Sequence, residues 1–104
     1  MDETLKAEWV KALRSGRFKQ GRKRLATKDG SSYRFCCLGV LARISGYSVR
    51  EIREDNTSLR PCGEDFGLVG NELKELALLN DGDVALGVAP HSFDQIADHI
   101  EANL

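Results

Sequence analysis

The sequence lacks the features of a membrane or secreted protein. No apolar run approaches the roughly 18 residues that a membrane-spanning helix needs, so we expect no membrane partner. The first ten residues, MDETLKAEWV, carry acids and lack the basic-then-apolar order of a signal peptide, which favours a cytoplasmic location. With 104 residues, the chain can build one modest core but not two, so we expect a single compact domain over residues 1–104.

Residues for the common catalytic and metal chemistries are also scarce. The chain has two histidines and three cysteines, with no CxxC or HxxxH pair at the spacing of zinc ligands. No GxGxxG or P-loop sequence is present, and a solvated helix face explains the carboxylate row Asp94, Asp98 and Glu101. The sequence therefore predicts no catalytic residue, no metal site, no cofactor and a protein that is not an enzyme.

Apolar residues at helical spacing predict most of the secondary-structure elements of the chain. A first helix, ending at Gly16, has its apolar side formed by Leu5, Trp9, Ala12 and Leu13. Two reciprocal capping boxes predict further helices: Ser48 with Glu51 for a short helix over residues 49–54, and Ser92 with Gln95 for an amphipathic C-terminal helix. Another helix is expected between them, capped by Asn71 and ended by Asn80-Asp81-Gly82.

The stretch FCCLGVLAR, residues 35–43, places two cysteines where the periodicity changes. Tyr33 and Phe35 continue a two-residue alternation, whereas residues 37–44 follow helical spacing. We therefore expect Cys36 to close a strand and Cys37 to begin a buried helix, in which Gly39 permits close approach to a neighbour. Both thiols are interpreted as small core groups, since free cysteine is among the most buried residue types.

Basic residues are concentrated between the first helix and this cysteine pair. Residues 1–50 hold 12 Lys or Arg against 4 Asp or Glu, and residues 51–104 hold 3 against 12. The pair Asp29-Gly30 suits a tight turn, so the basic segment is predicted to form a β-hairpin with strands near 22–27 and 32–36. Alternation would place Arg22 and Arg24 on one face, with Arg34 on the paired strand.

The basic hairpin has two interpretations. It can bind an external anion, in which case the expected ligand-binding residues are Arg17, Lys19, Arg22, Arg24 and Arg34. Alternatively, it can complement the protein's own acidic half or remain solvated. Both readings stay open from the sequence.

Residues 41–54 also have the spacing of a helix-turn-helix, through Ala42, Gly46 and Ile52. The second helix of such a corner, SVREIREDN, carries three acidic residues against two arginines, which would largely repel phosphate. An ordinary helical corner is therefore the favoured reading. DNA binding through this corner is kept as the alternative function.

Four blocks of the sequence resemble those of a family of short phage and prophage proteins. They are Trp9-x-x-Ala12-Leu13-x-Ser15-Gly16-x-Phe18-x-Gln20-Gly21, then Phe35-Cys36-Cys37-Leu38-Gly39-Val40-Leu41, then Leu79-Asn80-Asp81, and finally Phe93-x-x-Ile96-Ala97-x-x-Ile100. Together they are spread over most of the chain. The resemblance implies a phage setting, in the cytoplasm of the host cell, and supplies no activity.

These observations predict a small, mainly helical α+β domain with one β-hairpin between the first and second helices. The favoured function is that of a non-enzymatic phage accessory protein. Its expected partner is a host protein, such as a defence component, or a nucleotide-like anion, bound through the basic hairpin. Nucleic acid is the partner under the alternative reading, with contacts from the corner at residues 41–54.

Overall fold

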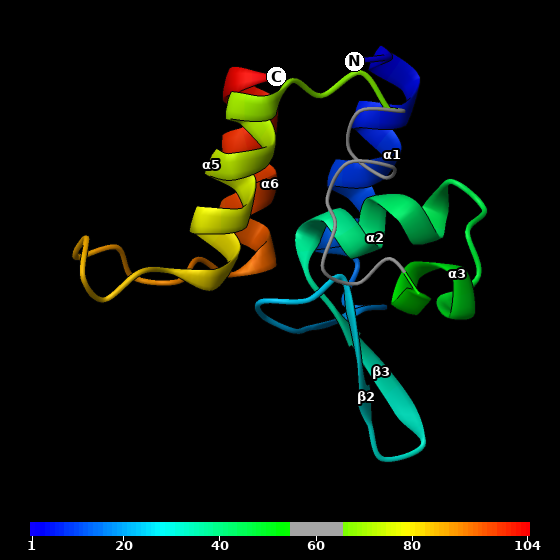
Figure 1. Cartoon of the computed structure of the whole chain (residues 1–104). Helices are drawn as coiled ribbons and strands as arrows, with labels where there is room; N and C mark the ends of the chain where they lie inside the picture. The colour runs from blue at the N-terminus through cyan, green and yellow to red at the C-terminus, as the bar shows by residue number, and fades with distance from the viewer. Residues whose placement is uncertain (55–65) are drawn as a thin grey trace.

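The computed structural model describes residues 1–54 and 66–104 and shows an α+β fold in which helices predominate. In chain order the elements are α1 (Glu3–Arg14), β1 (Lys19–Gln20), β2 (Ala26–Asp29), β3 (Ser32–Phe35), α2 (Cys37–Ile44), α3 (Val49–Glu54), α5 (Gly70–Asp81) and α6 (Phe93–Asn103). The predicted fold class is confirmed, because the β2-β3 hairpin lies between α1 and α2 (Figure 1). Pro61 and Gly63 predict an irregular segment, DNTSLRPCGEDFG, after the short helix, and residues 55–65 of this segment lie outside the described residues.

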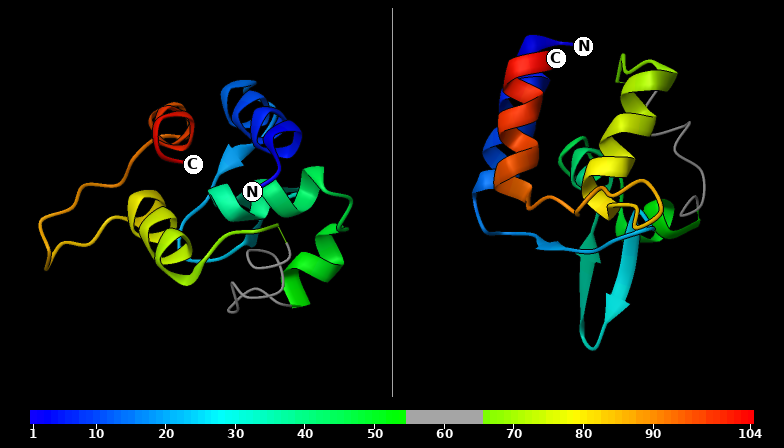
Figure 2. Two further views of the ribbon diagram at one scale, coloured as in Figure 1. Left: turned by 90° about the horizontal axis from the view of Figure 1, so that it is seen from above. Right: turned by 90° about the vertical axis from the view of Figure 1, so that its left-hand side faces the viewer.

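The helices enclose a core centred on α2. Helices α1 and α6 lie side by side, which brings the two chain ends to the same end of the molecule (Figures 1 and 2). Trp9 on α1 is fully buried, and its indole Nε1 donates a hydrogen bond of 2.9 Å to the carbonyl oxygen of Cys37 on α2. Helix α5 packs on both α2 and α6. None of the helices in the described part of the chain is long and apolar enough to cross a membrane.

The sheet has the strand order β1-β3-β2. Strands β2 and β3 are antiparallel, with pairs from Ala26↔Phe35 to Asp29↔Ser32, and the hairpin projects beyond the helices (Figure 1). Their two-residue loop, residues 30–31, uses Gly30 at a φ of +63°, which glycine adopts at little cost. The predicted bounds 22–27 for the first strand are wrong, since β2 begins only at Ala26. Strand β1, parallel to β3, was not predicted.

The change of periodicity at the cysteine pair is confirmed. Cys36 is the N-cap of α2, where its Sγ accepts a hydrogen bond from the N–H of Gly39 at 3.4 Å, and Cys37 is the first helical residue. The close approach at Gly39 is confirmed as well. A Cβ at this position would lie 1.9 Å from the carbonyl oxygen of Leu25, so only glycine fits here without a shift of the backbone.

Both predicted capping boxes are present. The N–H of Ser48 donates to Oε1 of Glu51 and the N–H of Glu51 donates to Oγ of Ser48, each at 3.1 Å. Ser92 and Gln95 exchange the same pair of bonds at the start of α6, at 2.9 and 3.2 Å. The predicted start of α5 at Asn71 is wrong, because the helix begins at Gly70. At this end the N–H of Val69 donates a hydrogen bond to the carboxylate of Glu72.

Candidate functional site

A buried asparagine organises the region where α5, α2 and the basic segment meet. Asn80 is fully buried, and its Oδ1 accepts hydrogen bonds from the backbone N–H of Cys37 and from Nε2 of Gln20, both at 3.1 Å. Its Nδ2 donates to the carbonyl oxygen of Gly21 and to Oδ1 of Asp81, both at 2.9 Å. The sequence predicts only a helix end at this position. All polar atoms of the side chain have partners, so Asn80 holds structure in place rather than offering a free ligand group.

These bonds fix the connector between β1 and β2, residues 21–25. Oδ1 of Asp81 accepts a 2.7 Å hydrogen bond from the N–H of Lys23, which has a left-handed φ of 70°. Leu25 is fully buried, and its carbonyl oxygen accepts from the N–H of Cys36. Arg22, Lys23 and Arg24 are exposed between these anchors. The connector therefore presents three basic side chains from a backbone that is held at both ends.

Arg24 contributes to a groove between the hairpin and α3, which we call the arginine groove. It has a volume of about 470 Å³ and is lined by Arg24, Tyr33, Val49, Arg50, Arg53 and Glu54. The guanidinium of Arg53 lies 5.6 Å from the centre of the Tyr33 ring, within the range of a cation–π contact. The strand register places Lys28 directly opposite Tyr33, on the same face of the hairpin.

The arginine groove is electropositive. Its three arginines face a single carboxylate, that of Glu54, which accepts a 3.2 Å hydrogen bond from Nε of Arg50. The two side chains of this pair are 88% and 67% exposed, so the pair is weak and an anion can compete for the guanidinium. Arg24 and Arg53 form no ion pair with any residue in the described part of the chain. The carboxylate of the nearby Glu51 accepts a hydrogen bond from the backbone N–H of Ser48. Hydrogen bonds with Ser48 lower the pKa of this carboxylate.

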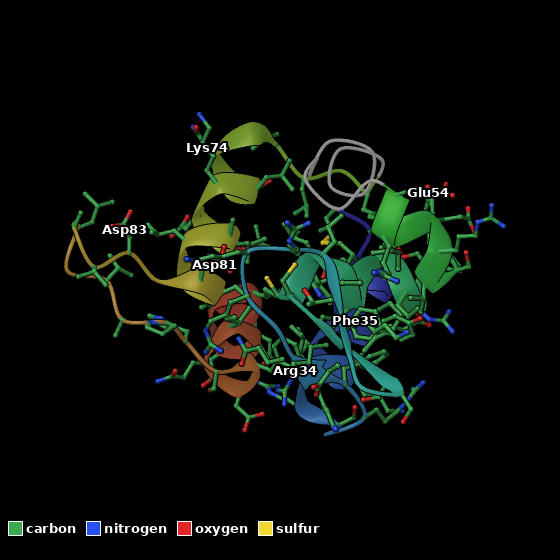
Figure 3. All side chains as sticks on the ribbon, turned by 60° about the horizontal axis from the view of Figure 1, so that its bottom comes forward. Arg34, Phe35, Glu54, Lys74, Asp81 and Asp83 are labelled. Carbon is green, nitrogen blue, oxygen red and sulfur yellow. The ribbon has the colours of Figure 1, made fainter. Side chains whose placement is uncertain are left out.

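The residues predicted to bind a ligand are not all brought together. Arg22 and Arg24 precede β2, so the expectation that they share a strand face is wrong. Arg34 alternates with Tyr33 along β3 and so lies on the opposite face of the hairpin, where its Nε is 3.0 Å from Oδ2 of Asp29. Figure 3 shows Arg34 on the hairpin and Glu54 on α3. The convergence of Arg24 and Arg34 that we expected is therefore replaced by that of Arg24 with the two α3 arginines.

Two other predicted residues lie outside the arginine groove. Lys19 is in β1, paired with Arg34, and the guanidinium of Arg17 lies 5.3 Å from the centre of the Phe18 ring. Arg50 and Arg53 line the arginine groove, whereas the sequence assigns them only to the DNA-binding alternative. No local signal joins them to Arg24, because the contact between α3 and β2 is a tertiary one.

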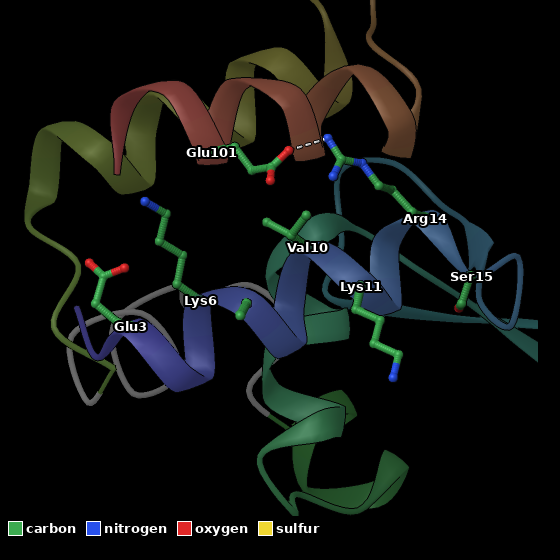
Figure 4. Close-up of a pocket in the computed structure, with 8 residues that line it drawn as sticks. Glu3, Lys6, Val10, Lys11, Arg14, Ser15 and Glu101 are labelled. Carbon is green, nitrogen blue, oxygen red and sulfur yellow. Dashed lines mark ion pairs between the residues drawn. The ribbon is translucent and has the colours of Figure 1, made fainter.

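Helix α1 of the basic half forms ion pairs with the acidic helix α6 (Figure 4). Nη2 of Arg14 lies 2.6 Å from Oδ1 of Asp98 and also contacts the carboxylate of Glu101. Within residues 1–54 and 66–104, the arginines of the arginine groove have no such contact with α6. Intramolecular complementarity thus accounts for Arg14 and leaves the positive charge of the groove uncompensated by the acidic helix.

The adjacent thiols are placed for packing. Cys36 and Cys37 are both buried, and burial raises the pKa of the Cys36 thiol to about 11 and that of Cys37 well above its ordinary value. A nucleophilic cysteine needs the opposite shift, toward the thiolate. Among the described residues no group of three His, Cys, Asp or Glu side chains is arranged to hold a metal ion. Cys62 lies outside the described residues.

Residues 1–58 match a family model described as Domain of unknown function (DUF8296). The chain belongs to this family. The matched segment is more than half of the 104 residues and contains α1 to α3 with the sheet, and therefore every residue that lines the arginine groove. Asn80 positions the connector of this DUF8296 segment but lies outside the matched residues, on α5. No curated protein and no solved structure matches the chain.

Proposed function

We propose that this DUF8296 protein is a non-enzymatic binding protein that holds a nucleotide-like, phosphate-bearing anion in the arginine groove. The observation that carries the proposal is the convergence of Arg24, Arg50 and Arg53 around Tyr33, with one weakly held carboxylate among them. The guanidinium group suits this role because its planar fork of donors matches phosphate oxygens, and it keeps its charge at any working pH.

The size and lining of the groove favour a nucleotide over a bare inorganic ion. A volume of about 470 Å³ falls within the range of small-molecule sites and exceeds the need of one phosphate group. Tyr33 and Val49 add an aromatic and an aliphatic surface beside the arginines. A ligand with both a phosphate and a flat base would use the two kinds of surface together.

The biological setting that we propose follows the resemblance to short phage proteins. In that setting the protein would act as an accessory factor in the host cytoplasm, either by capturing a nucleotide-like anion or by engaging a host or defence component that carries one. Both variants use the same arginine groove. They differ in whether the phosphate belongs to a free molecule or to a protein-bound one.

Calorimetric titration with adenosine triphosphate and with inorganic pyrophosphate tests the proposal. Two triple variants, each lacking three positive charges, are compared: Arg24→Ala, Arg50→Ala, Arg53→Ala against Arg17→Ala, Lys19→Ala, Arg34→Ala. The first should weaken binding by at least about tenfold, because each lost charge-assisted hydrogen bond is worth about 1.5–3 kcal/mol. The second should change it by less than about threefold. Equal losses in both would show that only net charge matters, and no binding by the wild type would refute the proposal.

DNA binding remains the second candidate, and one observation favours it. Helices α2 and α3 do form a helical corner, with Gly46 at a φ of +103° in the turn and Ile52 almost fully buried. The exposed face of α3 nevertheless carries Glu51 and Glu54 beside its two arginines. We expect selection from random DNA duplexes to recover no preferred site. A defined site whose retention is lost in Arg50→Ala, Arg53→Ala would replace nucleotide binding as the function.

A further inference from the structure

One carboxylate outside the matched residues 1–58 is bonded to the backbone of the connector. Asp81 is the last residue of α5, and its Oδ1 accepts the 2.7 Å hydrogen bond from the N–H of Lys23. Figure 3 shows Asp81 at the end of α5 beside the connector. Asp81 does not line the arginine groove, whereas Arg24, the residue that follows Lys23, does. The carboxylate therefore contacts the backbone directly before a groove residue without belonging to the groove.

The bond to Asp81 holds Lys23 in a conformation that lysine rarely adopts. Its φ of 70° is left-handed, and Lys23 is the one residue other than glycine with a positive φ within residues 1–54 and 66–104. The Cβ atom is crowded in this region, so a lysine without tertiary support would favour a negative φ. A change of φ at Lys23 would turn the chain that follows and so redirect the side chain of Arg24. Backbone strain of this kind persists only where neighbouring groups hold it.

The backbone is fixed on both sides of Arg24. Before it, the N–H of Lys23 is bonded to Asp81. After it, Leu25 is fully buried, and its carbonyl oxygen accepts a 3.2 Å hydrogen bond from the N–H of Cys36. Loss of the Asp81 bond would leave only the later of these two points in place, and the strain at Lys23 would then be free to relax.

The end of α5 that carries Asp81 is itself held in place. Nδ2 of the fully buried Asn80 donates to Oδ1 of Asp81 at 2.9 Å, which orients the carboxylate. The N–H of Gly82 donates to the carbonyl oxygen of Leu78 at 2.7 Å. A Cβ on Gly82 would lie 2.7 Å from the backbone nitrogen of Pro90, so this helix end is closely packed. A carboxylate on such an end can fix the position of the connector.

We propose that Asp81 is a positioning residue for anion binding, which keeps Arg24 directed into the arginine groove by holding the N–H of Lys23. The inference rests on the proposed function of that groove and adds the residue that positions one of its arginines. A guanidinium that is already in place loses little conformational entropy when a phosphate binds. Helix α5 thus contributes to the site from outside residues 1–58, although it supplies no lining residue.

The charge of Asp81 has the opposite effect on anion binding from its hydrogen bond, so the two can be separated. A carboxylate near basic side chains reduces their attraction for an anion, and its neutralisation alone should strengthen binding. Loss of the hydrogen bond should weaken binding, because only a fraction of the molecules then present Arg24 correctly. If that fraction is about one in five, the apparent dissociation constant rises about fivefold.

Calorimetric titration with adenosine triphosphate compares two substitutions that remove the same charge. Asp81→Ala removes the acceptor oxygen, whereas Asp81→Asn keeps an oxygen that can accept from the N–H of Lys23. Asp81→Ala should weaken binding by about fivefold, and Asp81→Asn should bind at least as tightly as the wild type. Equal weakening by the two variants would overturn the proposal, and so would an unchanged affinity of Asp81→Ala.

The same bond can be removed from the connector, at an exposed residue. Lys23→Pro lacks the N–H and forces φ to about −65°, whereas Lys23→Gly keeps the N–H and accepts a left-handed φ. Both variants lose the same lysine charge. Lys23→Pro should bind adenosine triphosphate about fivefold more weakly than Lys23→Gly. Equal affinities of this pair would contradict the proposal even if Asp81→Ala failed to fold.

Combination with Arg24→Ala shows whether Asp81 acts through Arg24. In the Arg24→Ala background, the added change Asp81→Ala should weaken binding no further, because the side chain that it positions is gone. A further loss there would assign the effect to general loosening of the structure and overturn the proposal. A wild type that binds no adenosine triphosphate would refute the proposed function together with this inference. Wild-type binding that depends on Arg24 but not on Asp81 would refute this inference alone.

Discussion

The side-chain oxygen of Asn80 accepts a hydrogen bond from the backbone N–H of Cys37 at 3.1 Å, across a separation of 43 residues. The first N–H groups of a helix have no partner within the helix, and Cys37 is the first residue of α2. Asn80 supplies that partner from α5. The same side chain also binds the connector at Gly21, so one residue joins α5 to both α2 and the basic segment.

We expect Asn80→Ala to lower the free energy of unfolding by about 2–4 kcal/mol, because it leaves the buried N–H of Cys37 and carbonyl of Gly21 without partners. Chemical denaturation measures this loss. Asn71→Ala, at an exposed position of the same helix, should change stability by less than about 0.5 kcal/mol. Similar effects of the two substitutions would contradict the role assigned to Asn80.

Gly39→Ala should destabilise the protein by about 3 kcal/mol or more, since its Cβ would collide with the backbone of Leu25. Gly70→Ala is the matched control, because Gly70 is also helical and a Cβ there meets no atom within 4 Å. That control should be neutral or slightly stabilising. Circular dichroism of both variants during thermal unfolding makes the comparison, and a Gly39→Ala variant as stable as the control would show that α2 can move away from the connector.

Cys36→Ser and Cys37→Ser should differ in their effects on stability. Serine is a preferred N-cap, so at position 36 its hydroxyl can accept the hydrogen bond that Sγ accepts from Gly39, and the change should cost less than about 1 kcal/mol. Cys37 is fully buried within α2, where a hydroxyl should cost about 1–3 kcal/mol. Denaturation midpoints of the two variants test this order, and a larger loss at position 36 would argue against the N-cap role.

The buried thiol of Cys36 predicts a loss of stability in alkali. Its pKa is higher in the folded protein, about 11, than its ordinary value of 9.0, so the folded state holds the proton more tightly. This contribution is fully present below pH 9 and is lost as the pH rises toward 11. Between pH 9 and 11 the free energy of unfolding of the wild type should therefore fall by about 2–3 kcal/mol relative to that of Cys36→Ser. If the difference in free energy of unfolding between the two proteins stayed constant from pH 8 to 11, the burial of the thiol would be contradicted.

Single substitutions at Arg24 on the connector and at Arg34 on β3 should separate the arginine groove from the remaining basic surface. Arg24→Ala should weaken adenosine triphosphate binding by about tenfold, whereas Arg34→Ala should leave it within about twofold, because Arg34 pairs with Asp29 on the other face. Both side chains are exposed, so neither change should lower the melting temperature appreciably. Equal weakening by the two variants would restore the convergence that we first expected from strand alternation.

The sequence by itself determined the helices and several of their ends, although not strand β1 or the start of β2. The capping pairs at Ser48 and Ser92 and the change of period at Cys36 were correctly predicted. These features depend on residues three or four positions apart, whose interactions are set by backbone geometry alone. The close approach at Gly39 was also predicted, although the residue that it meets, Leu25, was not.

Only the tertiary structure decided which distant groups meet. The pairing of β1 with β3, the contacts of Asn80 and the indole bond from Trp9 to Cys37 join residues from 15 to 60 positions apart. Arg24 does not share a strand face with Arg34, because it lies on the connector before β2 begins. It lines the same groove as Arg53, because α3 packs against the hairpin. Periodicity fixes the face of an element on which a residue lies, whereas the neighbour of that face is chosen by the packing of the whole core.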